Sequence, residues 1–161
     1  MSETEELADK LRKEGERLGD FFGTLTANQW KAEVYTEIAV WTIRNVLAHL
    51  MTTERAFVKV FENILQGGEG VSDDFVIDRY NARQQEKTKD LDPMELLEQY
   101  KGFRKDMIGL VTRINDADLE KAGRHPYLGI TTLREMIKMV YIHNQIHYRD
   151  IKKVLSQSHP N

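Results

Sequence analysis

The chain has 161 residues, of which 40% are hydrophobic and 30% charged, and its formal net charge is -3 at pH 7. This length and balance predict one globular domain over residues 1–161, and the interspersed acids and bases predict no nucleic-acid partner. The chain has no cysteine, no apolar leader and no run of 18 apolar residues. We therefore exclude disulfides and thiolate metal ligands, and expect a cytoplasmic protein without membrane contact.

The first expected helix covers residues 3–24. Ser2 and Glu5 form a capping box in front of it, and leucine and phenylalanine residues then recur at mostly helical spacing. A second capping box predicts a short turn over residues 26–30, and an irregular stretch follows over residues 31–39.

Three glycines lie inside this first helix at four-residue intervals: Gly15, Gly19 and Gly23. Glycine weakens a helix by up to about 1 kcal/mol per residue relative to alanine. The spacing is compatible with the close approach of another helix. It is equally compatible with a loosely specified helix that tertiary packing holds in place.

The second long helix is expected over residues 41–66, where apolar residues recur with a period close to 3.6. A glycine-rich run at residues 67–70 ends it. Residues 73–89 are polar and permissive for helix, with few large apolar side chains. We interpret them as a helical arm or lid outside the core.

The third long helix is expected over residues 92–115, because Asp92 suits the N-cap and Pro93 the first helical position. Residues 116–129 then form a connector with one short helical turn before Gly123. The last long helix is expected over residues 132–155, and we expect residues 156–161 to be frayed.

Four long helices, without period-two alternation or internal repeats, predict an all-α four-helix bundle. Proteins of this architecture build metal and ligand sites from side chains on facing helices. The distribution of histidine is therefore informative.

Three histidines are expected to face one interior. His143 and His147 lie four residues apart on the last helix, where i,i+4 spacing brings side chains together. Both share a row with apolar residues. His49 lies in a similar row of the second long helix, so two helices present histidine to a common space.

These histidines have two interpretations, which the spacing alone leaves open. They are either core residues satisfied by hydrogen bonds or the ligands of one metal ion, which would satisfy several buried imidazoles together. Three imidazoles suit Zn²⁺, Ni²⁺, Co²⁺ or Fe²⁺, and zinc or nickel is our first expectation. Such a site is open and could activate water or a thiol, or polarise a carbonyl.

Three other titratable residues are candidates for a role beside these histidines. Glu54, one turn beyond His49, is a candidate acid–base or supporting group, but we favour a surface partner of Arg55 or Lys59. For His125 we favour a solvated loop residue over a group at the bundle mouth. His159 lies in the tail, where we expect no role.

Aromatic and arginine residues give weaker indications. Trp30, Tyr35 and Trp41 could line a substrate pocket, although packing is the more common role of such residues. Three arginines could bind an anionic thiol, and the alternative is that they are solvated: Arg44, Arg134 and Arg149.

Several segments together resemble the DinB-like superfamily. The stretches LTANQW at residues 25–30 and WTIRNVLAHL at residues 41–50 resemble the first half of its pattern. Tyr80-Asn81, followed by the Asp92-Pro93 helix start, is similar to its middle. The TTL helix start at residues 131–133 and HNQIH at residues 143–147 resemble its second half. The resemblance covers about residues 5–155.

This resemblance implies an antiparallel four-helix bundle with a long crossover between its second and third helices. It also implies a metal site at His49, His143 and His147, and a homodimer. Some relatives are transferases or isomerases that use a low-molecular-weight thiol, and others are metal-dependent hydrolases or stress-induced proteins. We therefore expect a metal-dependent enzyme acting on a small molecule by thiol transfer, isomerisation or hydrolysis. The alternatives are a non-catalytic metal- or ligand-binding stress-response protein and a purely structural module.

Overall fold

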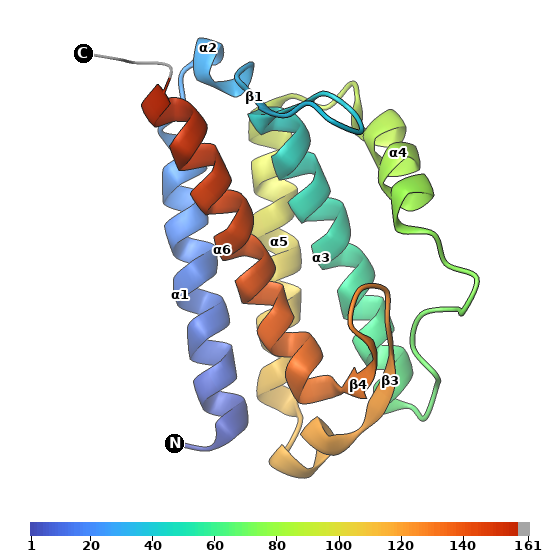
Figure 1. Ribbon diagram of the computed structural model, residues 1–161. Helices are drawn as coiled ribbons and strands as arrows, with labels where there is room; N and C mark the ends of the chain where they lie inside the picture. Colours follow the sequence, from blue (N-terminus) through green and yellow to red (C-terminus); the bar gives the residue numbers. More distant parts are fainter. Residues whose placement is uncertain (158–161) are drawn as a thin grey trace.

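The computed structural model describes residues 1–157 and consists mainly of four long helices (Figure 1). These are α1 (Glu3–Gly23), α3 (Ile43–Leu65), α5 (Pro93–Arg113) and α6 (Leu133–Gln157). Helices α1 and α6 run in one direction, and α3 and α5 run in the other. The predicted all-α four-helix bundle, with its long crossover between the second and third long helices, is confirmed.

Short elements connect these helices at both ends of the bundle. They are α2 (Ala27–Trp30), β1 (Glu33–Tyr35), β2 (Trp41–Thr42), α4 (Ile77–Thr88), the 3-10 helix η1 (Asp116–Glu120), β3 (Ala122–His125) and β4 (Gly129–Thr132). Strand β1 pairs with β2 and strand β3 pairs with β4, both antiparallel. The irregular stretch and the connector that we expected therefore each contain part of a small hairpin. Strands of two to four residues are too short for alternation to reveal them.

Side-chain caps explain where most helices begin. The capping boxes at Ser2 and Thr26 form as predicted, and the Asp92 carboxylate accepts the N–H groups of Met94 and Glu95. Helix α3 begins at Ile43 with Thr42 as its N-cap, next to the predicted start, and Trp41 and Thr42 pair with β1.

Helix α6 is longer than predicted. It continues through Gln157, two residues beyond the predicted end. Residues 158–161, which include His159, lie outside the described part of the chain.

The crossover is anchored at both of its ends. The N–H of Val71 donates to the carbonyl of Arg124 in β3, so the beginning of the crossover lies against the hairpin. Near its other end the guanidinium of Arg44, from the start of α3, donates to the carbonyls of Thr88 and Leu91. Within the arm expected over residues 73–89, only α4 (Ile77–Thr88) is helical, and it packs against α3.

Two apolar clusters form the core, one toward each end of the bundle. Leu11, Phe61, Met107 and Ile137 are central to the first, and Leu18, Leu47, Leu96 and Tyr100 to the second. Arg104 lies between Tyr100 and Met107 on α5 and is itself buried. The middle of the bundle is therefore polar, and this is the level at which the histidines lie.

Candidate metal centre

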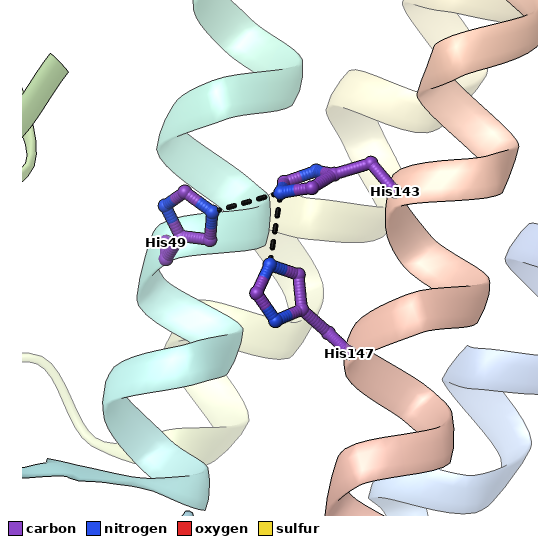
Figure 2. Close-up of side chains that lie close together, drawn as sticks. All are labelled: His49, His143 and His147. Atoms are coloured by element: carbon purple, nitrogen blue, oxygen red, sulfur yellow. Dashed lines mark hydrogen bonds between the residues drawn. The ribbon is translucent and has the colours of Figure 1, made fainter. Parts of the chain in front are cut away.

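The three predicted histidines meet between α3 and α6. Figure 2 shows the ring of His49 from α3 turned toward the rings of His143 and His147 from α6. The Nε2 atom of His143 lies 3.1 Å from Nε2 of His49 and 2.8 Å from Nε2 of His147. One ring nitrogen from each of the three lies within 4.8 Å of the others. The structure thus brings together three side chains separated by up to 98 positions in the sequence.

Tyr35 and Asp150 orient the ring of His147. The Tyr35 hydroxyl donates to the Asp150 carboxylate at 2.6 Å and lies 2.8 Å from Nδ1 of His147. Because the single hydroxyl proton is directed to the carboxylate, Nδ1 of His147 must carry a proton and donate to the Tyr35 oxygen. Nε2 of a neutral His147 then has a free lone pair, directed at the cluster.

Trp41 packs against His49. The two rings lie 5.0 Å apart between centroids, and Trp41 also contacts Tyr35. Trp30 instead stacks on Phe22 in the core. Of the three aromatic residues considered from the sequence, two therefore support site histidines, and Trp30 has a packing role.

Burial keeps all three histidines neutral. It is the main cause that lowers the pKa of His49 to about 3, of His143 to about 2 and of His147 to about 4, and mutual repulsion adds to it for the first two. Neutral imidazole is the form that binds a metal ion. The cluster is therefore in its ligating protonation state at pH 7.

The donor set fits a transition-metal ion. Ligand nitrogens about 2.0–2.1 Å from one ion lie about 3 Å apart when they occupy neighbouring positions, which matches the two Nε2 contacts. Nε2 of His143 lies against two other nitrogens yet can carry at most one proton, so hydrogen bonding among the histidines satisfies the cluster poorly. Within residues 1–157, no carboxylate joins the three-histidine group. A cation held here would keep open positions.

Glu54 lies beside this site, but in a role that we did not predict. Only 2% of its surface is exposed, and both carboxylate oxygens accept from Arg104, at 2.7 and 3.0 Å. The expectation of a surface partner for Arg55 or Lys59 is wrong. The true partner lies 50 residues away, so no local spacing could have indicated it.

Arg104 extends this contact into a network across the bundle. It also donates to the carbonyl of Leu11 in α1 and to the side chain of Asn144, next to His143 in α6. Tyr100 donates to the same Asn144 oxygen at 2.6 Å. All four long helices are therefore joined beside the histidine cluster.

His125 is buried rather than solvated, so that expectation is also wrong. Its ring is stacked on Phe57, with centroids 5.0 Å apart, and only 4% of its surface is exposed. Burial lowers its pKa to about 4. The β3–β4 hairpin, which the sequence did not reveal, carries this side chain into the interior.

The three arginines considered as anion ligands have other roles. Arg44 caps the crossover, Arg134 pairs with Glu3 and Glu120, and Arg149 is exposed beside Asp150. None of them lines the cavity next to the histidines.

This cavity has a volume of about 420 Å³. All three histidines line it, together with Glu54, His125 and mainly apolar side chains from α3, α4, the hairpin and α6. Ile77, Tyr80 and Asn81 come from α4, so the arm forms one wall of the cavity. The site therefore combines a potential cation position with an apolar chamber.

Fold and site together define a four-helix-bundle protein with a candidate three-histidine metal centre. Residues 10–151 match the family model of the DinB superfamily, and the chain belongs to that superfamily. No curated protein matches the chain.

Solved structures share the fold at low sequence identity. YfiT from Bacillus subtilis, described as a probable metal-dependent hydrolase with an unusual four-helix bundle topology, is 18% identical, with a TM-score of 0.79. The match covers 98% of this chain and 90% of that one. A mycothiol-dependent maleylpyruvate isomerase is 13% identical, with a TM-score of 0.76, over 92% of this chain and 60% of that one. Such identities indicate a common fold and leave the reaction open.

Another similar structure bears on the expected absence of a nucleic-acid partner. The colibactin self-resistance protein ClbS, solved in complex with a dsDNA, is 14% identical, with a TM-score of 0.75 and 96% of each chain covered. As for membranes, no helix within residues 1–157 has both the length and the apolar character needed to cross one.

Proposed function

We propose that this protein is a metal-dependent enzyme that acts on a small molecule through a divalent cation bound by His49, His143 and His147. The observation that carries the proposal is the convergence of three neutral imidazoles on one point beside a mainly apolar cavity. Three ligands leave room for a reacting group, whereas structural zinc sites are typically closed by four.

The cation and the side chains around it would have different roles in the reaction. A divalent cation supplies Lewis acidity, which activates a nucleophile or polarises a carbonyl. Tyr35 and Asp150 keep Nε2 of His147 directed at the cation. The apolar walls limit the access of bulk water and strengthen electrostatic interactions inside the cavity.

Zinc or nickel is the cation we propose, since imidazole suits both and the cluster contains neither carboxylate nor thiolate. The reaction would be hydrolysis, or a transfer or isomerisation that uses a low-molecular-weight thiol. A protein described as a probable metal-dependent hydrolase and a mycothiol-dependent isomerase both occur among the similar structures, which supports these two classes. No arginine or lysine within residues 1–157 lines the cavity, so no basic side chain there would hold an anionic thiol.

Two proposals concern partners. We propose a homodimer, which the superfamily resemblance supports and which light scattering would test. We also propose that the protein does not bind DNA, because its net charge is -3. A gel-shift assay with dsDNA tests this point, and saturable binding at physiological salt would contradict it.

Turnover by the metal-loaded protein tests the proposed function. The protein, loaded with Zn²⁺ or Ni²⁺, is screened with simple esters and amides and with electrophiles plus a thiol. We expect activity that falls at least 100-fold in His147→Ala and is unchanged in Lys153→Gln, an exposed position on the same helix. Activity that survives in His147→Ala would contradict the proposal. Tight metal binding without any turnover would favour the non-catalytic alternative.

A further inference from the structure

His125 contributes a hydrogen-bond donor that no group within residues 1–157 uses. Its Nδ1 accepts the backbone N–H groups of Tyr127 and Leu128, both at 3.0 Å. An imidazole nitrogen that accepts hydrogen bonds carries no proton, so in the neutral ring the proton must be on Nε2. The hairpin backbone therefore fixes the tautomer of His125.

Nε2 of this ring is buried and unpaired. Among the buried side-chain nitrogen and oxygen atoms in residues 1–157, it is the one without a hydrogen-bond partner. A buried donor without an acceptor destabilises the folded state, so such atoms call for an explanation. His125 lines the same cavity as the histidine cluster, and a molecule bound there could supply the acceptor once the protein atoms that now cover Nε2 move aside.

The other walls of the cavity restrict the chemistry of such a molecule. Phe57 stacks on the ring of His125 at an interplanar angle of 12°, which holds that ring in place. Glu54 is the one lining residue with a formal charge, and Arg104 already pairs with it. Without a cation at the histidine cluster, a charged ligand would therefore find no counter-charge in these walls, and its burial would be unfavourable.

We propose that the cavity binds an uncharged, mainly apolar molecule whose carbonyl or ether oxygen accepts a hydrogen bond from Nε2 of His125. The identification of this molecule as a substrate rests on the proposed function. In that case the oxygen anchors one part of the substrate, and another part reaches the histidine cluster. His125 is then a residue that determines substrate specificity and is not a metal ligand.

A matched pair of probes tests this proposal by binding. 2-Acetonaphthone carries a carbonyl oxygen, and 2-isopropenylnaphthalene has nearly the same shape with a methylene group instead. Calorimetric titration of the full chain should show about tenfold tighter binding of the ketone, the effect of one hydrogen bond to a buried donor. With a chelator present, so that no cation can neutralise the carboxylate, the anionic 6-acetyl-2-naphthoate should bind at least tenfold more weakly than the ketone. Equal affinities for ketone and alkene would overturn the proposal.

Removing the metal shows whether His125 or the cation binds the oxygen of the ketone. The titrations are made on Zn²⁺-loaded protein and again with a chelator present. The preference for the ketone should persist in both, and a preference seen only with Zn²⁺ would overturn the proposal. If the protein binds no metal but retains the preference, the proposed function fails and the binding site stands. If metal binds and no preference exists, the binding site alone fails.

The variant His125→Asn provides the residue-level control. Its side-chain oxygen can still accept from the N–H groups of residues 127 and 128, but it offers no donor at the position of Nε2. The preference for the ketone should disappear. Wild-type protein gives an independent measurement if the variant does not fold: long-range ¹H–¹⁵N NMR should show His125 protonated at Nε2, with a shift on adding ketone but not alkene. A proton on Nδ1 would overturn the proposal.

Discussion

Tyr35 shows how a residue outside the histidine cluster determines the protonation of a proposed metal ligand, His147. Its hydroxyl lies between Asp150 and Nδ1 of His147. Burial, and then the carboxylate of Asp150, raise the pKa of this hydroxyl, so it stays protonated. A hydrogen-bond chain of carboxylate, phenol and imidazole thus presents a lone pair at Nε2 of His147.

The variant Tyr35→Phe should weaken metal binding by about 10–100-fold, the usual effect of losing a partner of a ligating histidine. The ring and its contact with Trp41 remain, so the fold should be unaffected. Competition with a chromophoric chelator measures the affinity. Tyr148→Phe, one residue beyond His147, is the control and should bind metal as the wild type does. Equal affinities in all three proteins would contradict this role.

His125 should make stability depend on pH. Its pKa is 6.5 in an unfolded chain and about 4 when buried, so between these values only the unfolded chain binds the proton. The free energy of unfolding should therefore fall as pH decreases from about 6.5 to 4, with a slope from this residue of up to about 1.4 kcal/mol per pH unit. Urea titrations of the wild type and His125→Asn should show a shallower slope in the variant. Parallel slopes would contradict the burial of a titrating imidazole.

The sequence identified residues whose partners are close in the chain and missed those whose partners are distant. His143 and His147 are one helical turn apart, which made their shared face predictable. Tyr35 meets His147 across 112 positions, and Glu54 meets Arg104 across 50. No periodicity encodes such contacts, because they depend on how the helices dock.

At the scale of elements, the Glu54–Arg104 pair links the four long helices. Arg104 from α5 binds Glu54 on α3, Asn144 on α6 and the backbone of α1. Charged groups in such a buried layer stabilise the protein only while every partner is present. The network is therefore sensitive to the loss of any one member.

Arg104→Met should lower the free energy of unfolding by about 3–5 kcal/mol, because it leaves the Glu54 carboxylate buried without its partner. The exposed pair of Arg113 and Glu62 offers a matched control on the same two helices. Arg113→Met should cost less than about 1 kcal/mol. Urea unfolding measures both, and similar losses in the two variants would contradict the importance of the buried pair.

The glycines of α1 differ in role, which their spacing did not reveal. A Cβ atom at Gly15 would lie 2.8 Å from Cγ of Arg104, whereas one at Gly23 would meet nothing within 4 Å. Gly15 therefore permits close packing of α1 on α5. Gly102, in the middle of α5, also has open space around it.

Gly15→Ala should destabilise the protein by about 1 kcal/mol or more, because overpacking against the fixed Arg104 outweighs the gain in helix propensity. Gly102→Ala is the matched control and should stabilise by about 0.5–1 kcal/mol. Thermal unfolding of the two variants checks the signs. Stabilisation in both would show that α1 and α5 have room to separate.

Long helices were predictable, and short connecting elements were not. Caps such as Ser2 and Asp92 act within three or four residues, so the sequence marks where α1 and α5 begin. The hairpins depend on backbone pairing between short strands, and the packing of the helices at the ends of the bundle determines where these strands lie. Missing the β3–β4 hairpin also meant missing the burial of His125.

At the scale of the molecule, the crossover determines which helices face each other. It returns the chain to the end where α3 began, so α5 runs parallel to α3, and α6 then returns antiparallel to both (Figure 1). This topology sets α3 beside α6, with the three histidines between them and α4 along the cavity. A bound cation would join α3 to α6 and stabilise the folded state, by about 2.7 kcal/mol at 100 times its dissociation constant.

Metal content tests the central claim most directly. The protein is supplied with Zn²⁺ or Ni²⁺, freed of loosely bound ions by gel filtration and analysed by inductively coupled plasma mass spectrometry. The account predicts close to one ion per chain in the wild type and almost none in His49→Ala, His143→Ala or His147→Ala. A wild type that retains no stoichiometric ion, or variants that retain it in full, would contradict the account.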